Sequence, residues 1–309
     1  MKAILLNEYG GPEQLVLGDV PRPTPGPGEL LVQIHATSLN PVDLKRASGK
    51  MREVFPVKFP FIPGGDFSGT IESLGDGVET FHVGDEVFGY SMAGGAYAEY
   101  IVMGAKQVAL KPKQVTDVEA ASLAIVGQTA TQMVENANLM AGQTVLILGA
   151  GGAVGSILVQ LAHARGAKII AIAYAESAER LRKAGADVVI DAATTPLETA
   201  ANQVDVVFDC LGGELLHRSF PTLKRGGVLL SITMPPPAEE AVKYGVRAEM
   251  LFTKSSAETL QKLAEMVDRG EIKPFVGRTY SLNKASEVWA RSRSEHIEGK
   301  VVFTLPLSV

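Results

Sequence analysis

The chain has 309 residues, more than one hydrophobic core usually serves, and this length predicts about two domains. Hydrophobic residues make up 46% and charged residues 20%, which is typical of compact folded proteins and excludes a disordered or repetitive chain. The formal net charge of -5 comes without long runs of like charge, which argues against nucleic acid as a partner.

Membrane and secretion signals are missing from the sequence. No stretch of about eighteen apolar residues occurs, and the start of the chain becomes polar too early for a signal peptide. The single cysteine, Cys210, excludes an intrachain disulfide and any zinc site built from several cysteines. The histidines are widely scattered. We therefore expect a cytoplasmic protein with no membrane partner and no bound metal.

Short apolar runs separated by Gly and Pro occupy the chain up to about residue 115, and they predict an antiparallel β domain. The predicted strands cover residues 2–6, 30–38, 67–74, 85–90, 96–103 and 107–112. The segment 21–29 holds four prolines, so it cannot pair as a central strand and is predicted to be a surface loop.

The pattern changes near residue 116. Residues 116–137 are alanine-rich with helical spacing of apolar residues, and Thr116 followed by Glu119 forms a capping box at the start of this predicted helix. The apolar run 144–150 is too short for a helix and predicts a strand buried on both faces. Beyond it, helices alternate with strands, which predicts a parallel, doubly wound sheet. These further strands cover residues 168–173, 187–192, 204–210 and 226–232.

The last part of the chain supplies a helix at 258–270, a short strand near 278–282, a helix at 284–292 and a strand at 300–305. We expect these elements to rejoin the first domain. The predicted organisation is a substrate and catalytic domain at 1–116, a dinucleotide-binding domain at 117–255 and a C-terminal return at 256–309.

A glycine-rich turn, GAGGAVG at 149–155, follows the predicted buried strand and precedes an amphipathic helix. A dinucleotide pyrophosphate needs backbone N–H groups at a helix N-terminus, and small residues let the backbone approach it. Gly152 and Gly155 fit the second and third glycines of GxGxxG, while Ala150 occupies the first place. A tight turn could use these glycines for packing alone, but the strand, turn and helix together favour a dinucleotide site.

The end of the second parallel strand bears on the choice of dinucleotide. An NAD site usually has an acid there, whereas here Tyr174 follows the strand. Ser177, Arg180 and Lys183 lie just beyond and could accommodate a 2'-phosphate, which favours NADPH over NADH, although Glu176 argues against this. Alternatively, these charges are only the solvated face of the next helix.

Several motifs occur together in a fixed order along the chain. They are NPVD at 40–43, PGGDFSG at 63–69, VGDEVFG at 83–89, GAYAEY at 95–100, GQTA at 127–130, the glycine turn, DCLGG at 209–213 and GKVV at 299–302. With them the chain resembles the medium-chain dehydrogenase/reductase superfamily, and within it the zinc-independent quinone oxidoreductase-like proteins. The resemblance covers nearly the whole length. It implies an α/β fold, with a Rossmann doubly wound parallel sheet and a GroES-like β-rich catalytic domain.

Zinc-dependent relatives hold the metal with a cysteine of the first domain and a histidine of a GHE-like segment. Here Asn40 stands near the first place and Gly65 with Asp66 at the second. The resemblance therefore implies hydride transfer without a metal, to electrophiles that accept hydride readily. We expect NADPH-dependent reduction of quinones or α,β-unsaturated carbonyl compounds.

By this resemblance, Asn40 and Lys45 are candidate donors beside the nicotinamide, and the proton donor is Lys45, Tyr90 or water. Turn chemistry alone equally allows Asn40 and Pro41 to form a turn, with Asp43 capping a helix. The resemblance also implies cofactor contacts at Thr129, Gly149, Gly152, Ala153, Val154, Gly155, Tyr174, Ser177, Arg180, Leu211, Gly212, Ile232, Thr233 and Lys300. Cys210 has no matching histidine motif and is expected to be structural.

Three other functions stay open at this point: an NADPH-binding interaction or sensor protein without catalysis, an enoyl reductase for carrier-bound acyl chains, and an ordinary zinc alcohol dehydrogenase. The second needs a basic docking patch that the sequence does not show. Residues 246–254 could supply an edge strand for a homodimer of Rossmann domains.

Overall fold

The computed structural model describes residues 1–191, 193–194, 196–197, 201–292, 295 and 298–305. It divides into two compact units. The first comprises Met1–Ile125, Ser255–Arg269 and Pro274–Val309, and the second comprises Val126–Lys254 and Gly270–Lys273. Among the described residues, no helix is long and apolar enough to cross a membrane.

Helix α2 (Asp117–Asn136) runs through the boundary between the units. The sequence places this boundary at the start of the helix, whereas the division falls after Ile125. The reason is that the first turns of α2 pack in the first unit, where Ala120 and Ala124 share a core cluster with Phe88.

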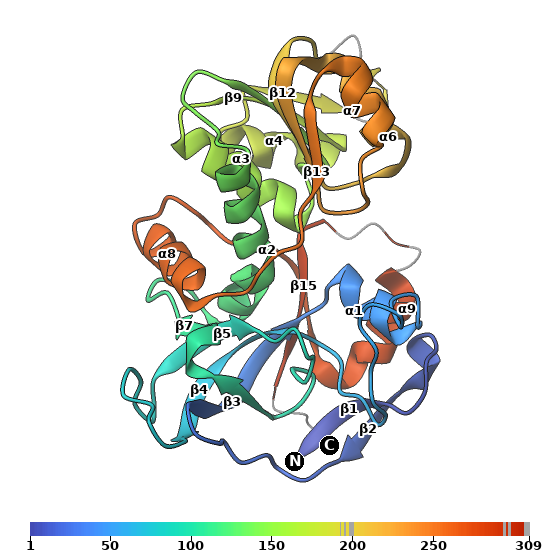
Figure 1. Ribbon diagram of the computed structural model, residues 1–309. Coiled ribbons are helices and arrows are strands. Elements are labelled where there is room, and N and C mark those ends of the chain that lie inside the picture. Colours follow the sequence, from blue (N-terminus) through green and yellow to red (C-terminus); the bar gives the residue numbers. More distant parts are fainter. Residues whose placement is uncertain (192, 195, 198–200, 293–294, 296–297, 306–309) are drawn as a thin grey trace. The chain divides into compact units, whose positions relative to one another are not determined.

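The first unit is built on a seven-stranded sheet, in which the strands follow the order β14-β15-β3-β4-β5-β7 and β6 also pairs with β3. Figure 1 labels β3, β4, β5, β7 and β15 of this sheet. Their bounds are β3 Glu29–Ser38, β4 Asp66–Leu74, β5 Glu86–Tyr90, β6 Tyr100–Gly104, β7 Val108–Leu110, β14 Val276–Ser281 and β15 Lys300–Thr304. All neighbours are antiparallel except β14 and β15. The predicted antiparallel domain is confirmed, although the strand predicted at 96–103 begins only at Tyr100.

A separate hairpin joins β1 (Lys2–Leu6) to β2 (Leu15–Asp19). The sequence prediction missed β2, because this strand leaves Val16 and Leu17 exposed and therefore lacks the alternation that marks a half-buried strand. The proline-rich segment 21–29 lies outside the strands up to Glu29, as predicted.

The C-terminal segment adds helices α8 (Ala257–Asp268) and α9 (Ala285–Ser292) to the first unit, and β15 pairs with β3. This segment joins the first unit, except that Gly270–Lys273 belong to the second. Trp289 of α9 is fully buried, and its indole N–H donates to the Tyr97 hydroxyl at 3.3 Å. Tyr97 in turn packs edge-on against Phe303 of β15.

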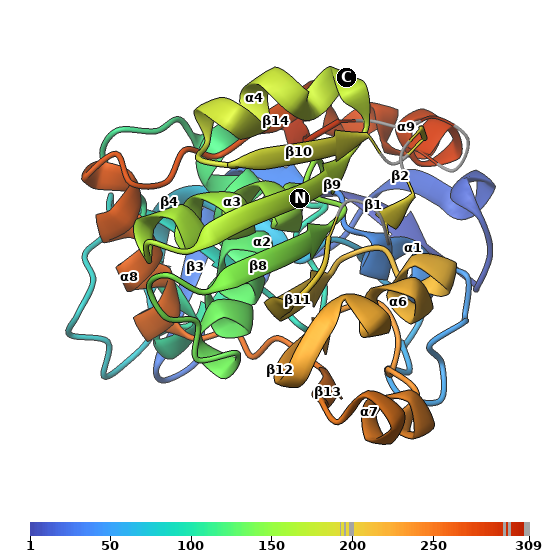
Figure 2. The ribbon, with the colours of Figure 1, turned by 90° about the horizontal axis from the view of Figure 1, so that it is seen from above.

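The second unit is a six-stranded parallel sheet in the order β10-β9-β8-β11-β12-β13 (Figure 2). The bounds of its strands are β8 Thr144–Leu148, β9 Lys168–Ala173, β10 Val188–Asp191, β11 Val204–Asp209, β12 Leu223–Ser231 and β13 Arg247–Met250. The helices are α3 Ala153–Ala164, α4 Ala178–Lys183, α6 Gly213–Ser219 and α7 Ala238–Tyr244. The doubly wound sheet is confirmed, although the last residue of the predicted strand 187–192 lies outside the described residues.

The order of these strands creates a switch point between β8 and β11. From β8 the chain moves outward through β9 to β10, then returns beside β8 and builds β12 and β13 on the other side. Ligands of open α/β sheets bind at the carboxyl ends of the strands, where the order reverses in this way. The glycine turn that follows β8 lies at this point.

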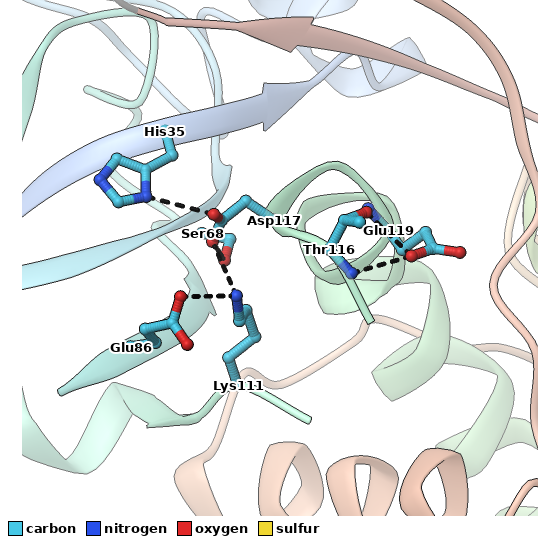
Figure 3. Close-up of polar contacts among 7 residues, drawn as sticks. All are labelled: His35, Ser68, Glu86, Lys111, Thr116, Asp117 and Glu119. Carbon is cyan, nitrogen blue, oxygen red and sulfur yellow. Dashed lines mark hydrogen bonds and ion pairs between the residues drawn. The ribbon is translucent and has the colours of Figure 1, made fainter. Parts of the chain in front are cut away.

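Two sets of polar contacts hold the start of α2 (Figure 3). The Glu119 carboxylate accepts the Thr116 backbone N–H at 2.8 Å, and the Glu119 N–H donates to the Thr116 hydroxyl at 3.3 Å, which confirms the predicted capping box. Asp117 accepts hydrogen bonds from His35 of β3 at 3.2 Å and Ser68 of β4 at 2.7 Å. The Lys111 ammonium lies 3.5 Å from Asp117. These contacts bind α2 to the antiparallel sheet.

Candidate functional site

The turn after β8 has a backbone that requires glycine. Gly149 has a φ of +79°, a left-handed conformation, and its N–H and that of Ala150 both donate to the Ile172 carbonyl of β9. A Cβ on Gly155 would lie 2.2 Å from the Gly149 carbonyl oxygen. Only glycine at 155 therefore lets α3 begin this close to the strand.

Helix α3 begins directly after Gly152, and no side chain caps it there. The first N–H groups of a helix have no partner within the helix, and those of Ala153 and Val154 belong to this set. Their direction and the helix dipole suit a phosphate. The turn therefore fits the pyrophosphate of a dinucleotide.

The end of β9 lies beside the glycine turn. A guanidinium nitrogen of Arg180 donates to the Gly151 carbonyl at 3.1 Å and lies 3.4 Å from the Ser177 hydroxyl. Tyr174, the residue after β9, is half exposed. Lys183 instead pairs with Glu179 at 2.7 Å on the exposed face of α4. Thus Arg180 and Ser177 adjoin the turn, while Lys183 fits the alternative of a solvated helix face.

The carboxyl ends of β11 and β12 are joined by Asp209, a fully buried residue. Its Oδ1 accepts the backbone N–H groups of Leu211 at 3.0 Å and Gly212 at 2.8 Å. Its Oδ2 accepts the hydroxyls of Ser231 at 2.6 Å and Thr233 at 3.0 Å. Four donors, from the end of β12 and from the loops after β11 and β12, converge on one carboxylate, which fixes the shape of this edge of the sheet.

The predicted cofactor residues after β11 and β12 are brought together around Asp209. Gly212 has a φ of 72°, and a Cβ added there would lie 2.6 Å from the Thr233 hydroxyl. The Ile232 N–H donates to the Asp209 carbonyl. A Cβ on Gly149 would meet the Leu211 side chain at 2.8 Å, so the loop after β11 lies against the glycine turn.

Thr129 and Cys210 are the remaining residues of the second unit for which the sequence predicts a role. The Thr129 hydroxyl of α2 lies 2.7 Å from that of Thr253, which follows β13. Burial, with the nearby Asp209 carboxylate, raises the pKa of the Cys210 thiol well above its ordinary value. A thiol held protonated in this way is a poor nucleophile, which supports the structural role expected for Cys210.

In the first unit, the predicted catalytic segment forms a short helix, α1 (Pro41–Ala47), with Asn40 at its N-cap. The Asn40 backbone N–H donates to the Asp43 carboxylate at 2.8 Å, so Asp43 caps the helix as turn chemistry allows. Lys45 lies exposed on α1. The cap at Asp43 that turn chemistry allows is thus present, whereas Asn40 and Pro41 start the helix directly and form no separate turn.

The Asn40 side chain lies in a buried polar cluster centred on Asp66, the first residue of β4. Asp66 Oδ2 accepts the Ser38 hydroxyl at 2.5 Å and the Asn40 amide Nδ2 at 2.7 Å, and its Oδ1 accepts the Ile125 N–H at 2.8 Å. The Lys300 ammonium lies 3.4 Å from Asp66 Oδ2 and donates a short hydrogen bond to Asn40 Oδ1. Lys300 thus contacts Asn40, the candidate catalytic residue. The expected contact of Lys300 with the cofactor stays a prediction.

Two titratable groups near this cluster have shifted pKa values. Burial raises the pKa of Asp43 to about 7. The Asp66 charge also raises this pKa, whereas the hydrogen bond from the Asn40 N–H and the charge of Lys300 lower it. Burial also raises the pKa of Tyr90, and the negative charges of Asp43 and Asp66 raise it further. Tyr90 therefore holds its proton more firmly than an ordinary phenol, which makes it a weaker acid.

Sequence reasoning singled out neither Asp66 nor Asp209 as a site residue. Both stand in motifs that were recognised, PGGDFSG and DCLGG, and each is an acid at the end of a buried strand. That placement is the signal that could have identified them. A buried carboxylate at a strand end must collect donors from its neighbours.

Comparison with known proteins places this fold and site in a family. Family models match residues 26–113, as an alcohol dehydrogenase GroES-like domain, and residues 184–303, as a zinc-binding dehydrogenase. The chloroplast envelope quinone oxidoreductase homolog of Arabidopsis thaliana is 33% identical over 98% of each chain. The chain belongs to the medium-chain dehydrogenase/reductase superfamily. Within the superfamily it falls in the zinc-independent, quinone oxidoreductase-like group.

Two more relatives support this assignment. The NADPH-dependent alkenal/one oxidoreductase of Arabidopsis thaliana is 31% identical over 98% of this chain and 79% of its own. The quinone oxidoreductase of Coxiella burnetii superposes with a TM-score of 0.91 at 30% identity, over 99% of each chain. As a medium-chain dehydrogenase/reductase, the protein is an oxidoreductase of a family that uses a nicotinamide cofactor. Among the described residues, no group of three His, Cys, Asp or Glu is placed to hold a metal ion.

Proposed function

We propose that this protein is an NADPH-dependent, zinc-independent reductase of quinones and α,β-unsaturated carbonyl compounds. The observation that carries the choice of cofactor is the anchoring of Arg180 on the glycine turn, at a strand end that has no acid. An arginine near this position accommodates a 2'-phosphate, whereas an acid would hold the ribose hydroxyls of NAD. The substrate class is supported by the names of the two Arabidopsis relatives.

We assign the cofactor contacts as follows. The N–H groups of Ala153 and Val154 bind the pyrophosphate, which the bare start of α3 supports. Gly152, whose own N–H donates to the Gly149 carbonyl at 3.1 Å, lets the pyrophosphate approach the backbone. Tyr174, Ser177 and Arg180 bind the adenosine end. Thr129, Gly212, Ile232 and Thr233 bind the nicotinamide half, an assignment supported by the shape that Asp209 imposes on the loops after β11 and β12. Bound NADPH supplies the hydride.

The protein's own groups then stabilise charge and manage the proton. The Asn40 amide donates a hydrogen bond to the substrate oxygen on which negative charge develops. Lys45, which is exposed, or water supplies the proton. Tyr90 is the weaker candidate because burial raises its pKa and so opposes proton release.

The experiment that tests this function is stopped-flow oxidation of NADPH and NADH with one quinone and one enone. We expect turnover with both electrophiles and a preference for NADPH. In Arg180→Gln this preference should fall by about tenfold, the equivalent of one charge-assisted hydrogen bond. The matched control is Lys183→Gln on the same helix, which should keep the preference.

Three outcomes would overturn the proposal. Equal use of NADH by the wild-type protein would remove the choice of cofactor. Tight NADPH binding, without oxidation by any quinone, enone or aldehyde, would favour the alternative of a non-catalytic interaction or sensor protein. Turnover restricted to carrier-bound acyl chains would instead favour an enoyl reductase.

We also propose a homodimer through the edge strand β13 of the second unit. Next to this strand, Val242 of α7 is 82% exposed and Phe252 is 65% exposed. Within the described part of the chain, β13 pairs only with β12, so its other edge pairs with no strand there. Phe252→Asp should shift the mass measured by analytical ultracentrifugation from dimer to monomer, whereas Val54→Asp in the first unit should not. A wild-type monomer would end this proposal. The cytoplasmic location stays a prediction.

A further inference from the structure

The orientation of the Asn40 amide is dictated by partners of opposite hydrogen-bonding character. An asparagine amide has nearly the same shape when its oxygen and nitrogen exchange places, so its neighbours decide which end points where. Lys300 can only donate, and it contacts Asn40 Oδ1. Asp66 Oδ2 accepts, and it contacts Asn40 Nδ2 at 2.7 Å. The reversed amide would face an ammonium with its NH2 and a carboxylate with its oxygen.

The three side chains form a closed ring that is itself held from outside. Lys300 and Asp66 approach each other to 3.4 Å. The Ser38 hydroxyl and the Ile125 N–H bind the Asp66 carboxylate on its two oxygens, so this side chain has one position. Lys300 is 4% exposed and Asp66 is fully buried. Neither partner can turn away to solvent.

Stability alone does not account for this arrangement. A buried ion pair is costly to desolvate, and apolar residues of similar volume often stabilise a protein as well or better. The ion pair of Lys300 and Asp66 also fixes one orientation of the Asn40 side chain. It thereby gives the remaining N–H of the Asn40 amide a single direction, which apolar residues could not do. In addition, an ammonium on the amide oxygen polarises the amide and strengthens its N–H as a donor.

We propose that Lys300 and Asp66 are positioning residues that lock the Asn40 amide in one orientation and so aim its NH2 group for hydrogen bonding to the substrate. This rests on the proposed function for the role of Asn40. It departs from the sequence-based expectation for Lys300, which was a contact with the cofactor. The two possibilities predict different results for the same variants.

A double-mutant cycle tests whether Lys300 acts through Asn40. We expect Lys300→Met to lower kcat by about tenfold, a fraction of the loss seen when such a donor is removed outright. In the Asn40→Ala background the same substitution should change kcat by less than about twofold, because the amide it orients is gone. Lys300→Arg keeps a donor for Asn40 Oδ1 and should restore most of the rate. Equal losses in both backgrounds would overturn the proposal.

The affinity for NADPH separates positioning from cofactor contact. If Lys300 orients Asn40, Lys300→Met should leave the Kd for NADPH, measured by fluorescence titration, within about twofold of the wild type. A much weaker Kd with an unchanged kcat would show a cofactor contact and would overturn the proposal. The control is Lys224→Met, which removes another lysine paired to an aspartate, Asp205, at 2.8 Å. It should leave both quantities unchanged.

An NMR measurement tests the lock without any turnover. The side-chain amide signals of Asn40, assigned by their loss in Asn40→Ala, should be shifted from those of a free amide and slow to exchange with water. In Lys300→Met they should move towards the free position, with exchange faster by about tenfold or more. Lys300→Leu, which also lacks a donor for Asn40 Oδ1, replaces Lys300→Met if the latter does not fold. Unchanged signals would overturn the lock. Retained amide signals in a protein without any turnover would instead count only against the proposed function.

Discussion

Asp209 Oδ1 lies 2.8 Å from the backbone nitrogen of Gly212, and the same carboxylate binds Ser231 and Thr233 through Oδ2. One buried acid thus joins the loops after two neighbouring strands of the parallel sheet. We predict that Asp209→Ala lowers the free energy of unfolding by about 3 kcal/mol, because it leaves buried donors without an acceptor. It should also weaken NADPH binding. Chemical denaturation and fluorescence titration measure the two effects.

Asp209→Asn and Asp191→Ala are the controls for this prediction. The asparagine retains an oxygen for the Leu211 and Gly212 N–H groups, so its cost should fall to about 1 kcal/mol. Asp191 ends the edge strand β10 and accepts the Ala193 N–H at 3.0 Å. Its removal should change stability by only about 0.5 kcal/mol and leave NADPH binding intact. An Asp209→Ala protein as stable as the wild type would contradict the role given to this carboxylate.

The glycines of the phosphate turn should separate folding from binding. A Cβ at Gly155 meets backbone atoms of Gly149 and Ala150 at 2.2 and 2.6 Å, and backbone cannot rotate away as a side chain can. We predict that Gly155→Ala lowers the free energy of unfolding by about 2–3 kcal/mol and impairs NADPH binding. At Gly152 the nearest atom is 3.4 Å from the added Cβ and the φ of -75° suits any residue.

Gly152→Ala should therefore keep wild-type stability yet bind NADPH more weakly, because the methyl group stands where the pyrophosphate approaches the backbone. Thermal unfolding with and without NADPH distinguishes the two variants. If both kept wild-type affinity, the turn would serve packing alone.

A structural feature could be predicted from the sequence when its physical cause lies within a short stretch of the chain. The glycine turn was predictable because Gly149 and Gly155 meet a steric requirement within seven residues of chain. The strands were predictable as short apolar runs between Gly and Pro, and α2 from the helical spacing of its apolar residues. Helices α1 and α7, of seven residues each, are too short for a clear period, and α7 follows a run of prolines that suggests a loop.

The partners of Asn40 and Asp66 could not be predicted in this way. The hydrogen bond between Asn40 and Lys300 joins residues 260 positions apart, and no spacing rule connects them. Asp66 likewise collects donors from 28 and 59 positions away, at Ser38 and Ile125. The family resemblance identified Asn40 as a candidate, but only the packing of β3, β4 and β15 brings its partners to it.

The buried Asp43 should make the protein less stable as the pH rises. Its pKa is about 7 in the folded state, raised by burial, against about 3.9 in an unfolded chain, so between these values the folded state binds more protons. Relative to Asp43→Asn, the wild type should lose up to about 4 kcal/mol of unfolding free energy as the pH rises from 4 to 8. Asparagine keeps an oxygen for the Asn40 N–H. A constant difference between the two proteins across this range would contradict the raised pKa.

The cluster at the start of α2 should respond to acid in the opposite sense. Burial alone would raise the pKa of Asp117, but hydrogen bonds from His35 and Ser68 and the charge of Lys111 outweigh it and lower the pKa to about 2. The folded pKa lies below the unfolded value of about 3.9, so the stabilisation is complete above pH 4 and is lost as the pH falls through 2. Asp117→Asn should remove about 2 kcal/mol at pH 5 and little near pH 2.

The contact between His35 and Asp117 also sets an upper pH limit to the stabilisation. The hydrogen bond to Asp117 raises the pKa of His35 above the usual 6.5. Its contribution is complete below pH 6.5 and is lost as the pH rises through the raised value, so His35→Gln should matter more at pH 6 than at pH 9. Asp85→Asn is the matched control, since Asp85 faces the exposed His82 at 3.7 Å and should change stability by only about 0.5 kcal/mol. Urea unfolding of the four proteins from pH 2 to 9 measures both of these pH limits. Parallel curves for wild type and Asp117→Asn would show that these contacts do not bind α2 to the sheet.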